Sequence, residues 1–231
     1  MVMVTALTIA LDYIGRGWNP VPVDYRTKKP STGNGWQLRI IDATNAPHYF
    51  NGGQMNIGVV LGPSSHGLTD VDLDCDEARA VAPYVLPRTG AIFGRASSRA
   101  AHWLYYTDLS INADKAVLIF NDPMTGGRIL ELRIGGANGA QTVFPGSTHE
   151  DTGEAIAWEE SGEPISVDGD ALARRIHELA AFLPSDCLAF LMYRTRENCL
   201  RATGAADAQL EHAAAGCRVI EIQNRLVGVY G

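Results

Sequence analysis

Three aspartates lie at alternate positions in one short segment, Gly67–Asp74. The segment reads Gly-Leu-Thr-Asp-Val-Asp-Leu-Asp, so Asp70, Asp72 and Asp74 are interleaved with β-favouring residues. On a strand, alternate side chains project from the same face, and three carboxylates would therefore stand side by side. Like charges on one face repel and raise one another's pKa, which a divalent cation relieves. Because all these ligands are oxygens, the segment predicts a site for Mg²⁺ or Mn²⁺.

A plainer interpretation of the same segment is a solvated acidic strand end that runs into a turn. Glu131 bears on the choice, because it lies between apolar residues in a predicted strand, Leu-Glu-Leu-Arg, where burial of an unpaired carboxylate is costly. Its partner is either Arg133, two residues on and on the same face, or a metal shared with the aspartates. In the second case two divalent ions could activate a 3′-hydroxyl and stabilise a leaving pyrophosphate, as two-metal phosphoryl transfer requires.

Such chemistry needs cationic and hydroxyl donors for a triphosphate, and two segments supply them. Charge-assisted hydrogen bonds from arginine and imidazole groups to phosphate are short and strong. The segment at 141–149 ends in hydroxyl and imidazole groups that form either a nucleotide-contacting rim or a polar turn, and a basic loop lies at 26–29. The candidate nucleotide-binding residues are Arg95, Ser97, Ser98, Arg99 and His102, then Ser147 and His149, and Lys29 from the basic loop.

Length and composition fit one substantial domain, with or without a helical appendage. The chain has 231 residues, of which 46% are hydrophobic, and a net charge of −7. That charge argues against a surface for strong nonspecific nucleic-acid binding, although bound metal would offset the acidic cluster at 70–77. The four cysteines show no disulfide or zinc spacing, and no leader or long apolar run is evident, so we expect a cytoplasmic protein without membrane association.

Apolar periodicity predicts an α+β fold in which short strands dominate the middle of the chain. A first helix is expected at 5–14, a second at 77–85, and amphipathic helices at 171–183, 185–200 and 205–215. Strands are expected at 18–23, 56–62, 91–95, 102–106 and 141–144, with a hairpin formed by 116–120 and 128–134. The segment at 97–99 is predicted to be a loop between two strands.

Taken in order, these pieces resemble the primase-polymerase domain of the archaeo-eukaryotic primase superfamily, as found at the N-terminus of phage and plasmid replication proteins. The resemblance covers roughly residues 5–160. It rests on the Gly-Trp-Asn-Pro-Val-Pro run from 17, Lys-Pro at 29, Gly-Trp at 35, Asn-Ile-Gly-Val at 56, the Asp-x-Asp strand, Phe-Gly-Arg at 93 with His102, Glu131, and the Pro-Gly-Ser turn at 145.

The resemblance implies roles for individual residues. The family's first motif maps to Asp70 and Asp72 or to Asp72 and Asp74, and the third motif's acidic residue maps to Glu131. The second motif is often Ser-x-His, but Ala100 stands two residues before His102, and we expect Ser97 or Ser98 with Arg99 to replace the serine contact. Mg²⁺ or Mn²⁺ is the implied cofactor, and single-stranded DNA template and (d)NTPs are the implied partners.

The resemblance also implies an architecture: a catalytic sheet like that of an RNA-recognition motif joined to an N-terminal α/β unit. We expect a catalytic domain at 1–165 and a helical segment at 166–231. That segment either assists template binding or serves as a packing appendage or a linker toward a helicase, and no Walker A loop accompanies it here. The predicted activity is template-dependent nucleotidyl transfer. A metal-dependent nuclease and a non-catalytic nucleic-acid-binding replication module are the alternatives.

Overall fold

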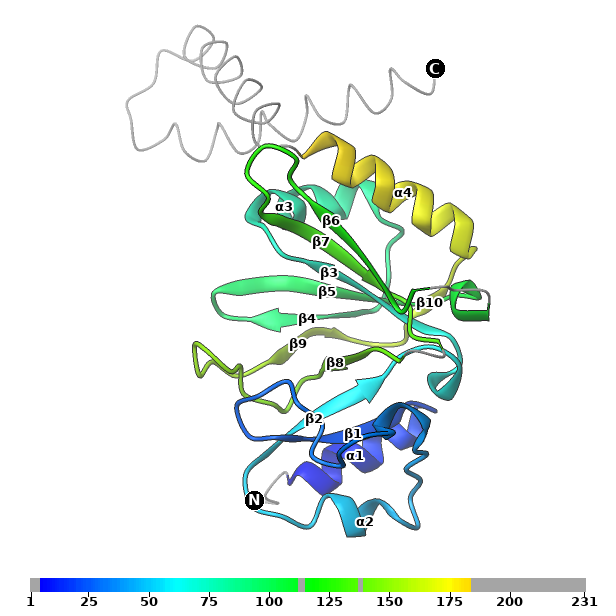
Figure 1. Cartoon of the computed structure of the whole chain (residues 1–231), viewed down its shortest axis with the longest axis vertical. Coiled ribbons are helices and arrows are strands. Elements are labelled where there is room, and N and C mark those ends of the chain that lie inside the picture. The colour runs from blue at the N-terminus through cyan, green and yellow to red at the C-terminus, as the bar shows by residue number, and fades with distance from the viewer. Residues whose placement is uncertain (1–4, 112–114, 137–138, 184–231) are drawn as a thin grey trace, which may run out of the picture.

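The computed structural model describes residues 5–111, 115–136 and 139–183. Two sheets dominate it, and Figure 1 shows them one above the other, with helices at both ends of the stack. The helices are α1 (Ala6–Gly15), α2 (Ala46–Tyr49), α3 (Asp76–Val85) and α4 (Gly169–Phe182). The strands are β1 (Asn19–Asp24), β2 (Met55–Val60), β3 (Leu68–Leu73), β4 (Ala91–Arg95), β5 (Ser98–Tyr106), β6 (Val117–Asn121), β7 (Arg128–Arg133), β8 (Gln141–Val143), β9 (Ala157–Ser161) and β10 (Ile165–Ser166).

The larger sheet has the strand order β6-β7-β3-β5-β4-β9, and all of these neighbours are antiparallel. The short strand β10 extends it by pairing in parallel with the end of β5. The smaller sheet has the antiparallel order β1-β2-β8. The strand with the alternating aspartates, β3, is therefore a central strand with a neighbour on each side.

Period-two alternation divides the large sheet into two faces with separate cores. Val71 and Leu73 of β3 pack with residues of α3 and α4 in one core. Leu68, on the other face of β3, belongs to a second core that includes α1 and β2. Figure 1 shows α3 and α4 at the end of the molecule that is remote from the small sheet. Asp70 and Asp72 share the face of Leu68 and so point toward the small sheet.

The helix α4 is part of this packing, because four of its apolar side chains are buried in the same core as α3 and β7. They are Leu172, Ile176, Leu179 and Leu183, the last at its C-terminal cap. Asp168 begins the helix by accepting a hydrogen bond from the N–H of Ala171 at 2.8 Å. A domain division at residue 165 stays a prediction, as do the helices expected at 185–200 and 205–215, which lie outside the described residues.

The α+β class is confirmed, and most predicted elements are present; the likeness to an RNA-recognition motif stays a prediction. The loop expected at 97–99 is wrong, because β5 already begins at Ser98 and leaves a tight turn after Arg95. The sequence analysis also missed β9 and β10. Both are exposed strands within the acidic stretch near 150–170, and β9 lies at the sheet edge, so neither carries the alternation that marks a half-buried strand.

Candidate active site

Strand register brings acidic residues of two strands and a histidine of a third together at the middle of the large sheet. Asp72 lies directly opposite His102 of β5 on one side and opposite Glu131 of β7 on the other. Because directly paired residues on one face have neighbouring Cβ atoms, these three side chains must interact. The sequence analysis predicted that Asp72 and Glu131 share a site, and the sheet does place them side by side.

Asp70 is fully buried and is held by polar groups from two sheets. Its Oδ2 lies 3.0 Å from Nδ1 of His102 in the large sheet and accepts a hydrogen bond of 2.7 Å from Oγ1 of Thr142 in β8. Burial by itself raises the pKa of Asp70, but His102, Arg133 and Thr142 together outweigh burial and hold that pKa below its usual range. Asp70 is thus a partnered carboxylate inside the junction between the sheets.

Arg133 lies between the other two strand carboxylates. Its Nη2 is 3.0 Å from Oδ2 of Asp72 and 2.7 Å from Oε2 of Glu131, and Arg128 pairs with the second oxygen of Glu131. Burial lowers the pKa of the Arg133 guanidinium, but Asp72 and its acidic neighbours outweigh this and raise it, so the group remains charged. Arg133, the simpler of the two partners predicted for Glu131 from the sequence, is therefore paired with it in the structure. Arg133 also donates from Nη1 to the Gln141 carbonyl of β8 at 3.3 Å.

Asp74 follows the end of β3 and differs from the other acidic residues. Its backbone N–H still pairs with the Ile129 carbonyl of β7 at 2.9 Å, but among the described residues no hydrogen bond or ion pair engages its carboxylate. Partial burial raises its pKa to about 6, and the negative charges of Asp72 and Glu131 contribute to the rise. The repulsion between neighbouring carboxylates that the sequence predicts is thus present at Asp74.

A pocket of about 310 Å³ opens against this acidic face. Asp72, Asp74 and His102 line it from the large sheet, and Arg95 joins them from the end of β4. The opposite wall comes from β8 and from two loops. The remaining lining residues include Lys28, Arg133, Gln141, Thr142, His149 and Asp151. A volume of this size is at the lower end for a small-molecule site.

Basic side chains also line the pocket. Lys28 pairs with Glu150 at 2.9 Å and Arg95 lies 3.4 Å from Glu154, yet both cations face the pocket. Burial lowers the pKa of His149, and the positive charges of Arg95 and Lys28 lower it further. The pocket therefore combines the carboxylates of Asp72 and Asp74 with a group of basic side chains, Arg95, Lys28 and His149.

Other predicted contacts are directed elsewhere. Ser97 hydrogen-bonds to Glu154 through both its N–H and its hydroxyl, while Arg99 pairs with Glu159 at 2.9 Å and points into solvent. Ser98 is buried in β5. Ser147 is also buried, and its hydroxyl accepts from the Ile57 N–H at 2.9 Å. The side chain that reaches the pocket from the basic loop is that of Lys28, whereas Lys29 lies exposed outside the lining.

The sequence analysis missed Lys28, Gln141 and Thr142. Lys28 lay in the recognised basic loop, but nothing in a coil segment fixes which of two adjacent lysines faces a site. Gln141 and Thr142 lay in a predicted strand, and their role became visible only when β8 was placed against the acidic face. Gln141 holds the Lys28 loop through a 2.9 Å hydrogen bond from Nε2 to the Lys28 carbonyl.

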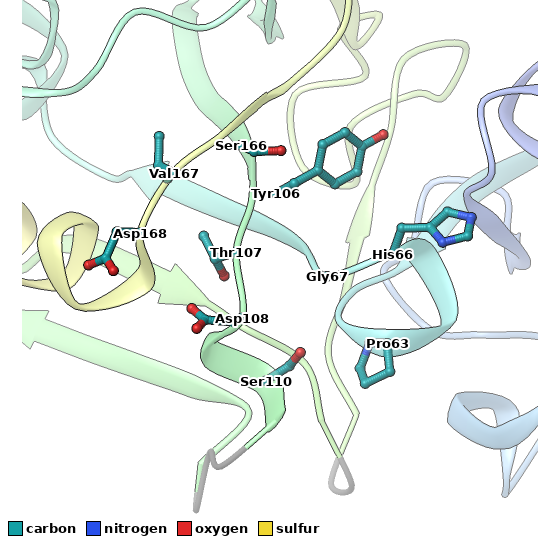
Figure 2. Close-up of a pocket in the computed structure, with 10 residues that line it drawn as sticks. All are labelled: Pro63, His66, Gly67, Tyr106, Thr107, Asp108, Ser110, Ser166, Val167 and Asp168. Carbon is teal, nitrogen blue, oxygen red and sulfur yellow. The ribbon is translucent and has the colours of Figure 1, made fainter.

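A second, more open hollow of about 530 Å³ shares no lining residue with this pocket. Figure 2 shows that it lies where β5 ends and α4 begins, with Tyr106, Asp108 and Asp168 around it and His66 on the other side. Asp168 is already used there as the cap of α4. The combination of paired carboxylates with cations is found at the first pocket.

The comparison with protein families fits this geometry. The family model described as bifunctional DNA primase/polymerase, N-terminal, or Prim-Pol, matches residues 10–174. The chain belongs to this family. No curated protein matches the sequence. Family membership indicates DNA primase/polymerase activity, which is nucleotidyl transfer with DNA and nucleotides as substrates, and Prim-Pol enzymes generally use divalent metals. No helix among the described residues is both long and apolar enough to cross a bilayer.

The residues of this Prim-Pol chain fit a divalent metal at one position better than at others. Asp72 and Asp74 both line the pocket, and the unpartnered Asp74 carboxylate is the kind of oxygen ligand that Mg²⁺ and Mn²⁺ prefer. Both oxygens of Glu131 are engaged by arginines, and Asp70 is engaged by His102 and Thr142. Of the four predicted acidic ligands, Asp72 and Asp74 are thus the two whose carboxylates can reach a metal in the pocket.

Replacing Arg133 with methionine should destabilise the protein by about 3 kcal/mol or more, because Asp72 and Glu131 would then be buried without their shared cation. Arg99→Met is the matched control, since it removes an arginine–glutamate pair in which Arg99 is 74% exposed, and it should cost far less stability than Arg133→Met. Urea unfolding of both variants gives the comparison. Equal losses of stability would contradict the central role of Arg133.

Replacing Asp74 with asparagine should stabilise the metal-free protein at neutral pH. Because the pKa of Asp74 is raised to about 6 in the folded state, its ionisation disfavours folding, and this penalty grows as pH rises from the ordinary carboxyl value through 6. The stability of Asp74→Asn and wild type should therefore converge at low pH, diverge as pH rises toward about 6, and stay apart by a constant amount at higher pH. Urea midpoints measured in chelator across this range test the sign, and a variant less stable at pH 7 would contradict it.

Proposed function

We propose that the first pocket is the nucleotidyl-transfer site of a template-dependent DNA primase/polymerase. One observation carries the proposal: the same pocket is lined by carboxylates, Asp72 and Asp74, and by cations, Arg95 and Lys28. A metal–nucleoside triphosphate complex requires both, because its metal binds carboxylate oxygens and its phosphates bind arginine, lysine and imidazole groups. The order of the sequence motifs and the family match agree with this use of the pocket.

In this proposal Asp72 and Asp74 hold Mg²⁺ or Mn²⁺. Bound there, the metal would polarise the reacting phosphate and lower the pKa of the attacking 3′-hydroxyl. Glu131 acts on this site by fixing Arg133, whose guanidinium lies 3.0 Å from Asp72 and holds that carboxylate in place. Asp72 and Asp74 can bind the metal while Asp70 and Glu131 keep their present partners.

Arg95, Lys28 and His149, which lie near one another in the pocket lining, bind the triphosphate together with His102. An incoming triphosphate can compete for Arg95 and Lys28 because their present partners, Glu154 and Glu150, are only partly buried. As phosphate approaches, the pKa of His149 should rise, since the anion offsets the cations that now suppress it. A protonated His149 would then donate a hydrogen bond from a ring N–H to a phosphate oxygen.

The proposal also includes the template, the biological setting and a partner protein. Single-stranded DNA is the expected template, and the replication systems of phages or plasmids are the expected setting. A helicase in the same or another chain is a further expected partner. The net charge of −7 favours a nucleotide-directed site over a chain that only binds DNA, because a nonspecific DNA surface depends on basic excess.

Asp72→Asn should abolish nucleotide incorporation while the protein still folds, because it removes a ligand charge at the proposed metal position. The assay follows labelled dNTPs and NTPs on a single-stranded template, with and without primer, in Mg²⁺ and in Mn²⁺. Arg99→Met serves as the control, since its side chain lies outside the pocket.

Primer-free product that is lost in Asp72→Asn would establish priming, and product only with primer would narrow the activity to extension. Normal incorporation by Asp72→Asn would refute the metal assignment. Degradation of labelled DNA without added nucleotides would instead identify a nuclease, and metal-independent DNA binding without synthesis would identify a binding module.

A further inference from the structure

Asp70 is the acidic residue of the central strand that the proposed transfer reaction does not use. It is fully buried, whereas Asp72 and Asp74 line the pocket. Both of its oxygens are near the imidazole of His102, at 3.0 and 3.3 Å from Nδ1, and Oδ2 also accepts from Thr142. A metal at Asp70 would have to displace these partners, so the role expected from the sequence does not suit its surroundings.

His102 is held on two sides. Its ring stacks on Phe93 with centroids 4.5 Å apart and planes inclined by 16°. Every hydrogen bond that the imidazole makes with the described residues uses Nδ1. Because His102 also lines the pocket, Nε2 is the ring nitrogen left for a ligand.

The chemistry of the contact fixes the proton. An ionised carboxylate can only accept hydrogen bonds, and Asp70 already accepts one from Thr142, so Nδ1 of His102 must be the donor. A histidine whose Nδ1–H is held by a carboxylate has a defined ring orientation and a defined free nitrogen.

We infer that Asp70 is a positioning residue that acts through His102, fixing the imidazole so that Nε2 faces the nucleotide phosphates in the pocket. The inference rests on the proposed function. It replaces the metal-ligand role expected for Asp70 and identifies Thr142 as the third member of the arrangement. The arrangement supplies a rigid phosphate contact at a site where Ala100 stands in place of the serine of the Ser-x-His motif. The backbone N–H of Ala100 does not supply this contact, because it donates a hydrogen bond of 2.5 Å to Glu159.

The direct test is the proton position on His102 in the wild-type protein. A ¹H–¹⁵N spectrum of the imidazole nitrogens, assigned with His102→Gln, should show a slowly exchanging proton on Nδ1. This proton should be lost or shifted in Asp70→Asn. A wild-type spectrum with the proton on Nε2 alone would overturn the inference, and that result does not depend on whether any variant folds.

The functional test is a double-mutant cycle on nucleotide affinity, measured with a fluorescent mant-labelled dATP in Mg²⁺. Asp70→Asn should weaken binding about ten-fold, the usual scale for losing the carboxylate behind a functional histidine. In the His102→Gln background the same change should have little further effect, because Asp70 acts through His102. An undiminished effect in that background would overturn the inference.

A metal titration separates the positioning role from a ligand role. Asp70→Asn should leave the Mn²⁺ dissociation constant within about two-fold of wild type, whereas Asp72→Asn should weaken it strongly. Thr142→Val should reproduce part of the loss in nucleotide affinity. Thr89→Val is its matched control, because Thr89 is a buried threonine that donates a 2.7 Å hydrogen bond to the Leu104 carbonyl away from the pocket.

The outcomes distinguish this inference from the proposed function. If wild-type protein binds no nucleotide but His102 carries the Nδ1 proton, the proposed function is wrong and the pairing of Asp70 with His102 stands. If nucleotide binds and Asp70→Asn weakens Mn²⁺ binding as much as Asp72→Asn does, Asp70 is a metal ligand. The positioning role is then wrong and the proposed function stands.

Discussion

The site depends on the register of β3 between β5 and β7. Because Asp72 is paired with His102 on one side and with Glu131 on the other, acidic and basic groups from three strands meet on one face. A slip of one residue would turn these groups toward the apolar core under α3 and α4 and bring Val71 and Leu73 to the pocket. The apolar residues of β3 thus fix the register, and the register forces like charges together. Arg133 makes that tolerable by pairing with both Asp72 and Glu131.

The small sheet turns this charged face into a pocket. Its strand β8 is joined to the large sheet by two polar contacts, from Thr142 to Asp70 and from Arg133 to the Gln141 carbonyl. These contacts give Asp70 and Arg133 partners in the small sheet as well as in the large one, and they leave Asp72 and Asp74 at the pocket wall. The same strand anchors the loop of Lys28 through Gln141. One short strand therefore positions both the acidic and the basic sides of the proposed nucleotide site.

Patterns local to one strand could be predicted from the sequence. Alternation placed Asp70 and Asp72 on one face, and the cost of burying Glu131 indicated that it needed a partner. Contacts set by distant segments could not be predicted. The turn before Ser98 is tight, Gly94 packs against backbone there, and Ala100 has a φ of 50°, which together direct Arg95 to the pocket and Arg99 to Glu159. The sequence around Ser147 also fits a nucleotide-contacting residue, but its hydroxyl accepts a hydrogen bond from the N–H of Ile57 in β2. Asp70 could not be distinguished from Asp74 without knowing that Thr142 lies against it.

In the proposed function, metal and triphosphate meet in the pocket between the two sheets. A crystal structure of the protein with Mn²⁺ and a non-hydrolysable dNTP, with manganese located by its anomalous scattering, tests this most directly. We expect manganese between the carboxylates of Asp72 and Asp74, with the triphosphate directed toward Arg95 and Lys28 and Nε2 of His102 toward a phosphate oxygen. Manganese bound elsewhere, or a nucleotide seated in the second hollow beside Asp108 and Asp168, would contradict the account.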